Sequence, residues 1–160
     1  MKHRLFILTL MLLTATITAL AQDGLKIKDI FDKYGKREGS VLLQLSSDVL
    51  SQGSNITSYK SLILDENTQN RMDIAEALKT DTRGKLTISE VKKDGLIESG
   101  SYYLGKDKTN NSEFILYKNK GRKITLVYLK GNFPSGHLDA ELKKLKDLFI
   151  YVNNKRIKLQ

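Results

Sequence analysis

Three segments of the chain have the residue pattern of a helix, and in the first and the third the apolar residues recur at helical spacing. The first covers residues 27–34 and ends at Gly35. The second begins after Asn67, a good N-cap residue, and ends by Gly84. The third begins at Leu138, with acidic residues in its first turn and lysines later, an order that suits the helix dipole. The first helix has one apolar face, so it is expected to pack against another part of the protein.

Shorter apolar runs predict two strands in the first half of the chain. Residues 41–45 predict one strand, and residues 59–64 predict a second. Between them, residues 51–58 are rich in Gly, Ser and Asn and predict a loop. Residues 86–93 fit either a strand or a continuation of the preceding helix, and the pattern does not choose between them.

Three further runs predict an antiparallel meander in the second half. They cover residues 96–104, 114–117 and 124–129, and the segments between them are rich in Gly, Asn, Lys and Asp. Connections this short cannot hold a crossover helix, so neighbouring strands are expected to run antiparallel. The last run is apolar on both faces, which is typical of a central strand.

This order of elements predicts an α+β fold: a single antiparallel sheet of about five strands, packed by two to three helices on one face. If the other face is open, tyrosines of the meander offer an aromatic binding surface; the alternative is that they only suit half-buried strand positions. Those tyrosines are Tyr102 or Tyr103, Tyr117 and Tyr128. Residues 150–160 either continue the last helix or fold back as a hairpin about Asn153 and Asn154.

The first 21 residues have the pattern of a cleaved secretory signal peptide. A basic start at residues 2–4 precedes an uncharged apolar stretch, and Ala19, Leu20 and Ala21 give a small-x-small cleavage sequence. The apolar stretch is shorter than the roughly 20 residues that span a bilayer. We therefore expect residues 22–160 to form one exported domain, periplasmic or secreted. It would have no transmembrane segment, and residues 150–160 would be a C-terminal extension.

Composition narrows the chemistry of this domain. The 160 residues include no cysteine, which excludes disulfides, thiolate metal sites and cysteine nucleophiles. His137 is the one histidine after the signal peptide, and the sequence has no nucleophile elbow, Walker loop or paired-histidine motif. The sequence therefore predicts a protein that is not an enzyme and binds no cofactor. The alternative is a carboxylate-dependent hydrolase, for which Glu98 and Glu113 are a candidate pair if the sheet register opposes them.

The net charge of +9 is unevenly distributed along the chain. Residues 22–117 hold 14 basic and 15 acidic residues, whereas residues 118–160 hold 11 basic and three acidic residues. Such a segment is expected to attract anionic lipid headgroups, polyanionic glycans or an acidic partner protein; the alternative is a solvated face that aids solubility. Nucleic acid is not an expected partner, because the sequence has no recognition motif and reads as exported. The candidate residues for an anionic partner are Lys143, Lys144, Lys146, Lys155, Arg156 and Lys158.

Several short segments follow one another in an order that is similar to a known family. They are Gly24 to Ile27 with Phe31, Arg71 to Lys79, Val91 to Gly95, Gly100 to Leu104 and Leu126 to Gly131. On these segments the chain resembles small exported proteins of Bacteroidetes type that are catalogued only as domains of unknown function. The resemblance covers residues 24 to about 145 and implies export and the meander, but no functional residues. We therefore expect a non-catalytic binding or interaction domain of the bacterial cell envelope, whose partner is an envelope protein or an anionic surface.

Overall fold

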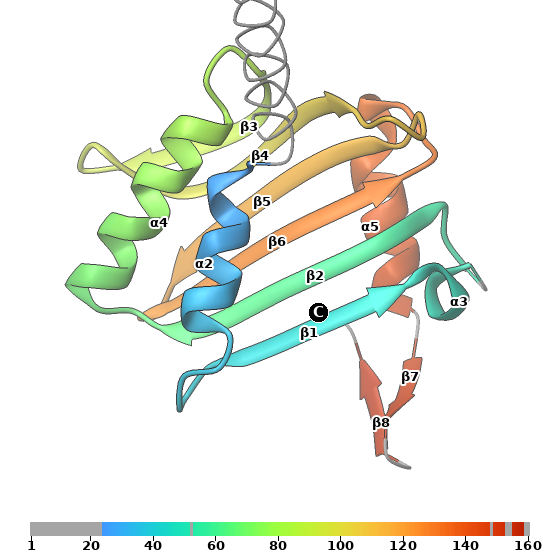
Figure 1. Cartoon of the computed structure of the whole chain (residues 1–160), viewed down its shortest axis with the longest axis horizontal. Coiled ribbons are helices and arrows are strands. Elements are labelled where there is room, and N and C mark those ends of the chain that lie inside the picture. The colour runs from blue at the N-terminus through green and yellow to red at the C-terminus, as the bar shows by residue number, and fades with distance from the viewer. Residues whose placement is uncertain (1–23, 52, 148, 153–154, 159–160) are drawn as a thin grey trace, which may run out of the picture.

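The computed structural model of the chain describes residues 24–51, 53–147, 149–152 and 155–158. The predicted signal peptide lies outside these ranges, as do Asn153 and Asn154, the expected turn of a C-terminal hairpin. Within them the chain forms one open sheet with helices on both sides, followed by a separate two-stranded hairpin (Figure 1). The fold class is therefore α+β, as the order of elements predicts.

The sheet has six antiparallel strands in the order β1-β2-β6-β5-β4-β3. Strands β4, β5 and β6 form the predicted meander, and β2 pairs with the free edge of β6, which places β6 in the centre. The strands are β1 (Val41–Ser46), β2 (Ile56–Asp65), β3 (Leu86–Lys93), β4 (Leu96–Lys106), β5 (Ser112–Lys120) and β6 (Lys123–Gly131).

The edge strand β3 is the segment that the sequence leaves undecided, and the expected number of about five strands is too low by one. All eight residues of β3 are exposed, so no buried face marks the strand in the sequence. A hydrogen bond fastens it to the sheet, because Tyr102 Oη of β4 donates to Glu90 Oε2 at 2.6 Å. The Tyr102 ring lies over Gly100, where a Cβ would come within 2.4 Å of the tyrosine oxygen. Only glycine at that position leaves room for this contact.

Four α-helices occur in the described part of the chain, more than the expected two to three. They are α2 (Lys26–Tyr34), α3 (Ser47–Leu50), α4 (Thr68–Asp81) and α5 (Leu138–Asp147), and a short 3₁₀ turn (Ser135–His137) precedes α5. The unexpected helix, α3, is a single turn of four residues, too short to show a 3.6-residue period. None of the described helices has the length and hydropathy needed to cross a membrane.

The helices cover both faces of the sheet, so the expectation of helices on one face is wrong. Helices α2 and α4 lie side by side on one face, which we call the two-helix face. Helix α5 packs on the opposite face, which we call the one-helix face, and the single turn α3 adds one buried residue, Leu50, to the core there (Figure 1). The physical reason lies in β6. Leu126 is buried in the core of the two-helix face, and its neighbour Val127 is buried on the one-helix face. A strand that is apolar on both sides requires a cover on each.

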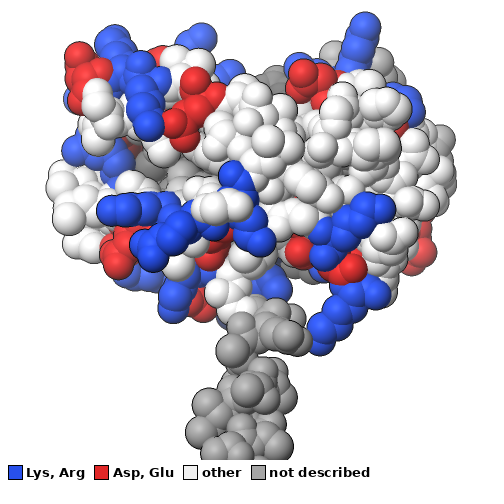
Figure 2. Space-filling view, turned by 90° about the horizontal axis from the view of Figure 1, so that it is seen from above, with Lys and Arg blue, Asp and Glu red and all other residues white. Residues whose placement is uncertain are grey.

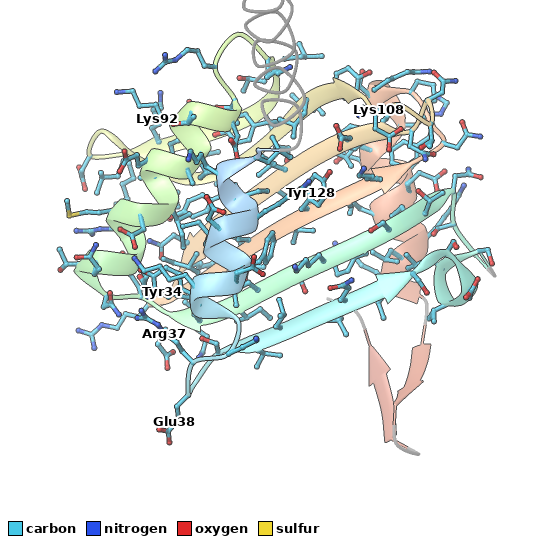
Figure 3. The ribbon with its side chains drawn as sticks, in the orientation of Figure 1. Tyr34, Arg37, Glu38, Lys92, Lys108 and Tyr128 are labelled. Carbon is cyan, nitrogen blue, oxygen red and sulfur yellow. The ribbon has the colours of Figure 1, made fainter. Side chains whose placement is uncertain are left out.

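The tyrosines of the meander form no open aromatic surface in the described structure. Tyr102, Tyr117 and Tyr128 are at most 6% exposed and belong to the core of the two-helix face, where Tyr128 lies beside α2 (Figure 3). Tyr103 is on the one-helix face, where its ring packs against Phe114 with the centroids 5.4 Å apart. Of the two alternatives that the sequence leaves open for these tyrosines, the structure has the one in which they are packed strand residues and not an aromatic binding surface.

Two buried carboxylates join segments that are far apart in the sequence. Asp81, the last residue of α4, accepts hydrogen bonds from the backbone N–H groups of Lys26 and Ile27 at 2.8 and 2.9 Å. These bonds satisfy donors at the start of α2. Glu141 of α5 accepts hydrogen bonds from the backbone N–H and the side-chain amide of Asn55 at 2.8 and 2.9 Å. The first contact joins the helices of the two-helix face, and the second ties α5 to the start of β2.

The chain folds back after α5. Strands β7 (Phe149–Val152) and β8 (Lys155–Lys158) pair as an antiparallel hairpin that is separate from the six-stranded sheet. Of the two alternatives that the sequence leaves open for this region, the structure has the hairpin.

Candidate functional site

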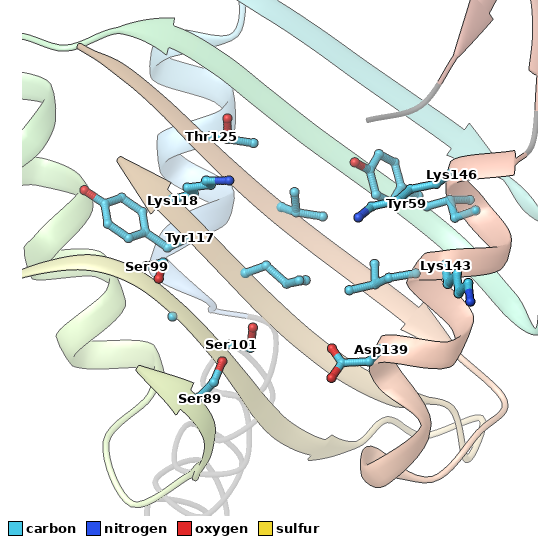
Figure 4. Close-up of a pocket in the computed structure, with 15 residues that line it drawn as sticks. Tyr59, Ser89, Ser99, Ser101, Tyr117, Lys118, Thr125, Asp139, Lys143 and Lys146 are labelled. Carbon is cyan, nitrogen blue, oxygen red and sulfur yellow. The ribbon is translucent and has the colours of Figure 1, made fainter. Parts of the chain in front are cut away.

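A groove lies on the one-helix face, between α5 and the sheet edge formed by β3 and β4 (Figure 4). Its volume is about 1030 Å³, at the upper end of the range for small-ligand sites. Strands β5 and β6 form the floor, which has both apolar and polar side chains: Leu116, Lys118, Thr125 and Val127. The far side carries Ser89, Ser99 and Ser101, and the wall made by α5 carries Asp139, Leu142, Lys143, Leu145 and Lys146.

The groove exists because α5 covers only one end of the strands. The helix crosses the sheet near that end, so the rows of side chains further along the strands have no helix above them (Figure 1). One such row, which we call the open row, runs from β1 to β3 through residues that oppose one another in the register. It consists of Val41, Ile63, Thr125, Lys118, Ser99 and Val91.

The groove carries more positive than negative charge. Lys118, Lys143 and Lys146 are exposed, and none of them makes an ion pair with a residue that the structure describes. Asp139 is the single acidic residue among the lining side chains. Burial raises the pKa of Tyr59, at the α5 end of the groove, so its phenol stays neutral at physiological pH. The arrangement suits a ligand that brings negative charge, accepts hydrogen bonds from hydroxyl groups and has an apolar part.

The six basic residues that the sequence predicts for binding an anionic partner do not lie together in one site. Lys143 and Lys146 line the groove. Lys144 instead points to Glu141, with Nζ 2.8 Å from the buried carboxylate, and therefore stabilises the attachment of α5. The other three, Lys155, Arg156 and Lys158, belong to β8, and their side chains lie outside the part of the chain that the structure describes.

Other lysines of the basic segment 118–160 also have structural partners. Lys123 Nζ lies 2.7 Å from Asp65, and half-buried Lys130 lies 3.0 Å from Asp107 and 3.2 Å from Glu113. Burial opposes the charge of Lys130, but the two carboxylates outweigh it and raise the pKa of that lysine. The basic segment is therefore not one continuous binding face.

The sequence does not indicate the hydroxyl side of the groove. Ser99 and Ser101 alternate along β4, and Ser101 opposes Ser89 on β3. Alternating serines in a strand are visible in the sequence. Their position opposite Ser89 depends on a register shift in the β3–β4 ladder, which the residue pattern does not predict. Lys118 is counted in the basic segment, yet only the register shows that it faces α5 across the groove.

The structure does not bring together Glu98 and Glu113, the candidate carboxylate pair. Glu113 opposes Gly105 in the β4–β5 ladder, so Glu98 lies seven residues away along β4, roughly 23 Å at the usual rise of a strand. His137 is exposed in the 3₁₀ turn before α5. Across the described residues, no group of three His, Asp or Glu side chains is placed to hold a metal ion.

A family match covers most of the chain, including the sheet and the groove. The family of unknown function DUF6108 matches residues 14–145. The chain belongs to this family. No curated protein and no solved structure matches the chain. The match to DUF6108 ends within α5 at Leu145, so the strands of the groove lie inside it and the β7–β8 hairpin lies beyond it. DUF6108 has no known function, which agrees with the resemblance drawn from the sequence.

Proposed function

We propose that the protein is a non-catalytic binding domain of the cell envelope, and that the groove beside α5 is its binding surface. Export through the signal sequence in residues 1–21 is part of this proposal. The partner is a protein or other molecule that presents negative charge together with apolar surface. Support comes from the groove itself, because its lining combines lysines, hydroxyl groups and aliphatic side chains.

One observation carries the proposal: the positive charge of the groove has no partner in the described structure. Lys118 lies on the floor of the groove, the two α5 lysines, Lys143 and Lys146, lie along its wall, and no second helix covers the floor. Elsewhere, comparable lysines such as Lys130 and Lys144 are neutralised by carboxylates. Cations that line a concave surface focus the electrostatic potential and attract an anionic partner.

A second candidate function is adhesion to any anionic surface, such as lipid headgroups or polyanionic glycans, through the whole segment 118–160. The 11 basic residues of that segment favour it. Against it, Lys123, Lys130 and Lys144 of that segment each pair with a carboxylate. On the side of the molecule seen from above the view of Figure 1, basic and acidic side chains also lie in mixed clusters (Figure 2). A mixed surface of this kind favours a local site in the groove.

Charge reversal distinguishes the two functions. The test variant combines Lys118→Glu, Lys143→Glu and Lys146→Glu. A control with the same change in net charge reverses three exposed lysines outside the groove, Lys36, Lys79 and Lys108. Binding is measured on polyglutamate, on heparin and on phosphatidylglycerol vesicles over a series of salt concentrations.

We expect the groove variant to lose at least tenfold in affinity for polyglutamate, while the control keeps most of its affinity. Equal losses in both variants would show that the net charge alone matters and would remove the groove from the proposal. Retention on vesicles or heparin that depends equally on all six lysines supports the second candidate.

A further inference from the structure

We propose that the groove binds one amphipathic α-helix of a partner protein, with acidic residues along the flank that faces α5. This helix takes the place of a second helix on the one-helix face. The inference rests on the proposed function, because it names the partner of the same site.

The dimensions of the uncovered surface fit a single helix. The open row crosses all six strands, which are five inter-strand spacings of about 4.8 Å, or about 24 Å in total. An α-helix of about 16 residues has this length. Helices that pack side by side have axes about 8–10 Å apart, a distance comparable to two or three residues along a strand. A helix parallel to α5 therefore covers the open row, as α2 and α4 together cover the opposite face.

Apolar side chains mark both ends of the open row. Val41 and Ile63 on β1 and β2 are 60% and 37% exposed, and Val91 on β3 is 51% exposed. Between them, Ser99 and Thr125 are small side chains over which a helix can approach the sheet closely. An apolar stripe on the partner helix would cover these positions, and their exposure in the isolated chain is then explained.

The lysines of the groove indicate which side of the partner helix carries its acidic residues. Lys143 and Lys146 lie on α5 along one side of the groove, and Lys118 lies on the floor (Figure 4). Glu or Asp residues at i, i+3 or i+4 spacing on a helix parallel to α5 would face these lysines. Charge complementarity of this kind selects the partner and the direction of binding.

A second copy of the chain does not supply this helix. In the described helices the large exposed apolar side chains are Met72 on α4 and Val49 on the one-turn α3, which form no stripe. Two copies that met groove to groove would also bring Lys118, Lys143 and Lys146 against the same lysines of the other copy. Residues 1–21 are apolar but include two basic and no acidic residues, so they do not complement the groove either.

The test uses the full chain after signal removal and two synthetic peptides of about 16 residues. The first has leucines at i, i+3, i+4 and i+7 with glutamates on one flank. The second has the same composition in scrambled order, so that its charge is equal but its apolar residues form no stripe. Binding is measured by calorimetry at low salt, and helix formation by circular dichroism of the mixture.

We expect micromolar binding of the striped peptide, at least tenfold tighter than that of the scrambled one, with a gain in helicity. Equal affinities would overturn the helix inference but keep the proposed function, because acidic probes still bind in the groove. Failure of both peptides and of polyglutamate to bind would overturn both.

A charge-neutral change in the protein separates the helix from simple electrostatics. Val41→Ser combined with Val91→Ser removes the outermost apolar side chain at each end of the open row, and Met72→Ser is the control on the opposite face. We expect the double variant to lose about tenfold in affinity for the striped peptide and to keep its affinity for polyglutamate. Thermal unfolding of each variant confirms that it is folded. Unchanged affinity for the striped peptide in a folded double variant would contradict helix docking on the open row.

Discussion

The two faces of the sheet bury their apolar residues under different numbers of helices, and their surfaces differ accordingly. On the two-helix face, α2 and α4 pack against each other and against the sheet, and 16 buried residues form one core. On the one-helix face, ten buried residues form the core under α5, while Val41, Ile63 and Val91 of the open row stay exposed.

From this difference we expect stability and the proposed binding to depend on opposite sides of the sheet. Burial of apolar surface stabilises a fold by roughly 25 cal/mol per Å², so the face with the larger core contributes more to the free energy of unfolding. Side chains of the open row remain in water and contribute little. Substitutions on the two faces are therefore expected to affect different properties.

The largest expected effect is a cavity on the two-helix face. Phe31 of α2 is 1% exposed within that core. Phe31→Ala removes a whole ring, and we expect it to lower the free energy of unfolding by about 3–5 kcal/mol. Urea denaturation followed by circular dichroism measures the loss. A loss below about 1 kcal/mol would mean that α2 contributes little to the core.

Loss of either buried carboxylate is expected to cost less, about 2 kcal/mol, because each leaves two hydrogen-bond donors without a partner. Asp81→Ala affects the two-helix face and Glu141→Ala the one-helix face. Since Glu141 fastens α5, its variant alone should also weaken binding of acidic probes to the groove. Asp29→Ala, at a side chain that is 77% exposed, is the control. Equal loss of binding in Asp81→Ala and Glu141→Ala would contradict the separation of the two faces.

The sequence predicts most of the two-helix face because its elements carry strong local signals. The period of α2 is complete, and Asn67 caps α4 by accepting from the backbone N–H of Asn70 at 2.9 Å. The meander follows from loop lengths alone. The sequence also contains a signal for helices on both faces. Leu126 and Val127 are adjacent apolar residues in a central strand, so they point to opposite faces, and helices on one face alone cannot bury both.

The groove could not be predicted from the sequence, because the pairing between strands brings its lining residues together. Ser89 and Lys118 reach the same groove only through the register of β3, β4 and β5, which includes two shifts in the β3–β4 ladder. The neighbouring residues Lys143 and Lys144 differ in role because they lie about 100° apart on the helix surface. One faces the groove and the other faces buried Glu141, a distinction that local sequence does not contain.

Acid is expected to weaken both faces. Hydrogen bonds from Lys33 and then Tyr34 lower the pKa of Asp73, which joins α4 to α2, to about 2. Burial opposes ionisation of Glu141, but Lys144 and other donors outweigh it and lower the pKa of that carboxyl on the one-helix face. Both folded-state pKa values lie below those of the unfolded chain, near 4.

The corresponding stability is therefore present above about pH 5 and is lost as the pH falls through 4 towards 2. Urea midpoints measured across this range should decrease steadily. Asp73→Asn and Glu141→Gln should each flatten the dependence in proportion to the lost carboxylate. A flat profile in the unmodified protein would show that these contacts do not form in solution.

The smallest expected effect is on the open row, and it completes the comparison of the faces. Val91→Ala should change the free energy of unfolding by less than about 0.5 kcal/mol, because the side chain is already half in water. Val127→Ala, on the same face but 7% exposed, should cost roughly 2 kcal/mol. If both changes lower the free energy of unfolding equally, the open row is part of the core, and the proposed difference between the two faces is wrong. If Val91 contributes little to folding, its exposed side chain is left available, together with Val41 and Ile63 of the same row, to contact an apolar partner surface.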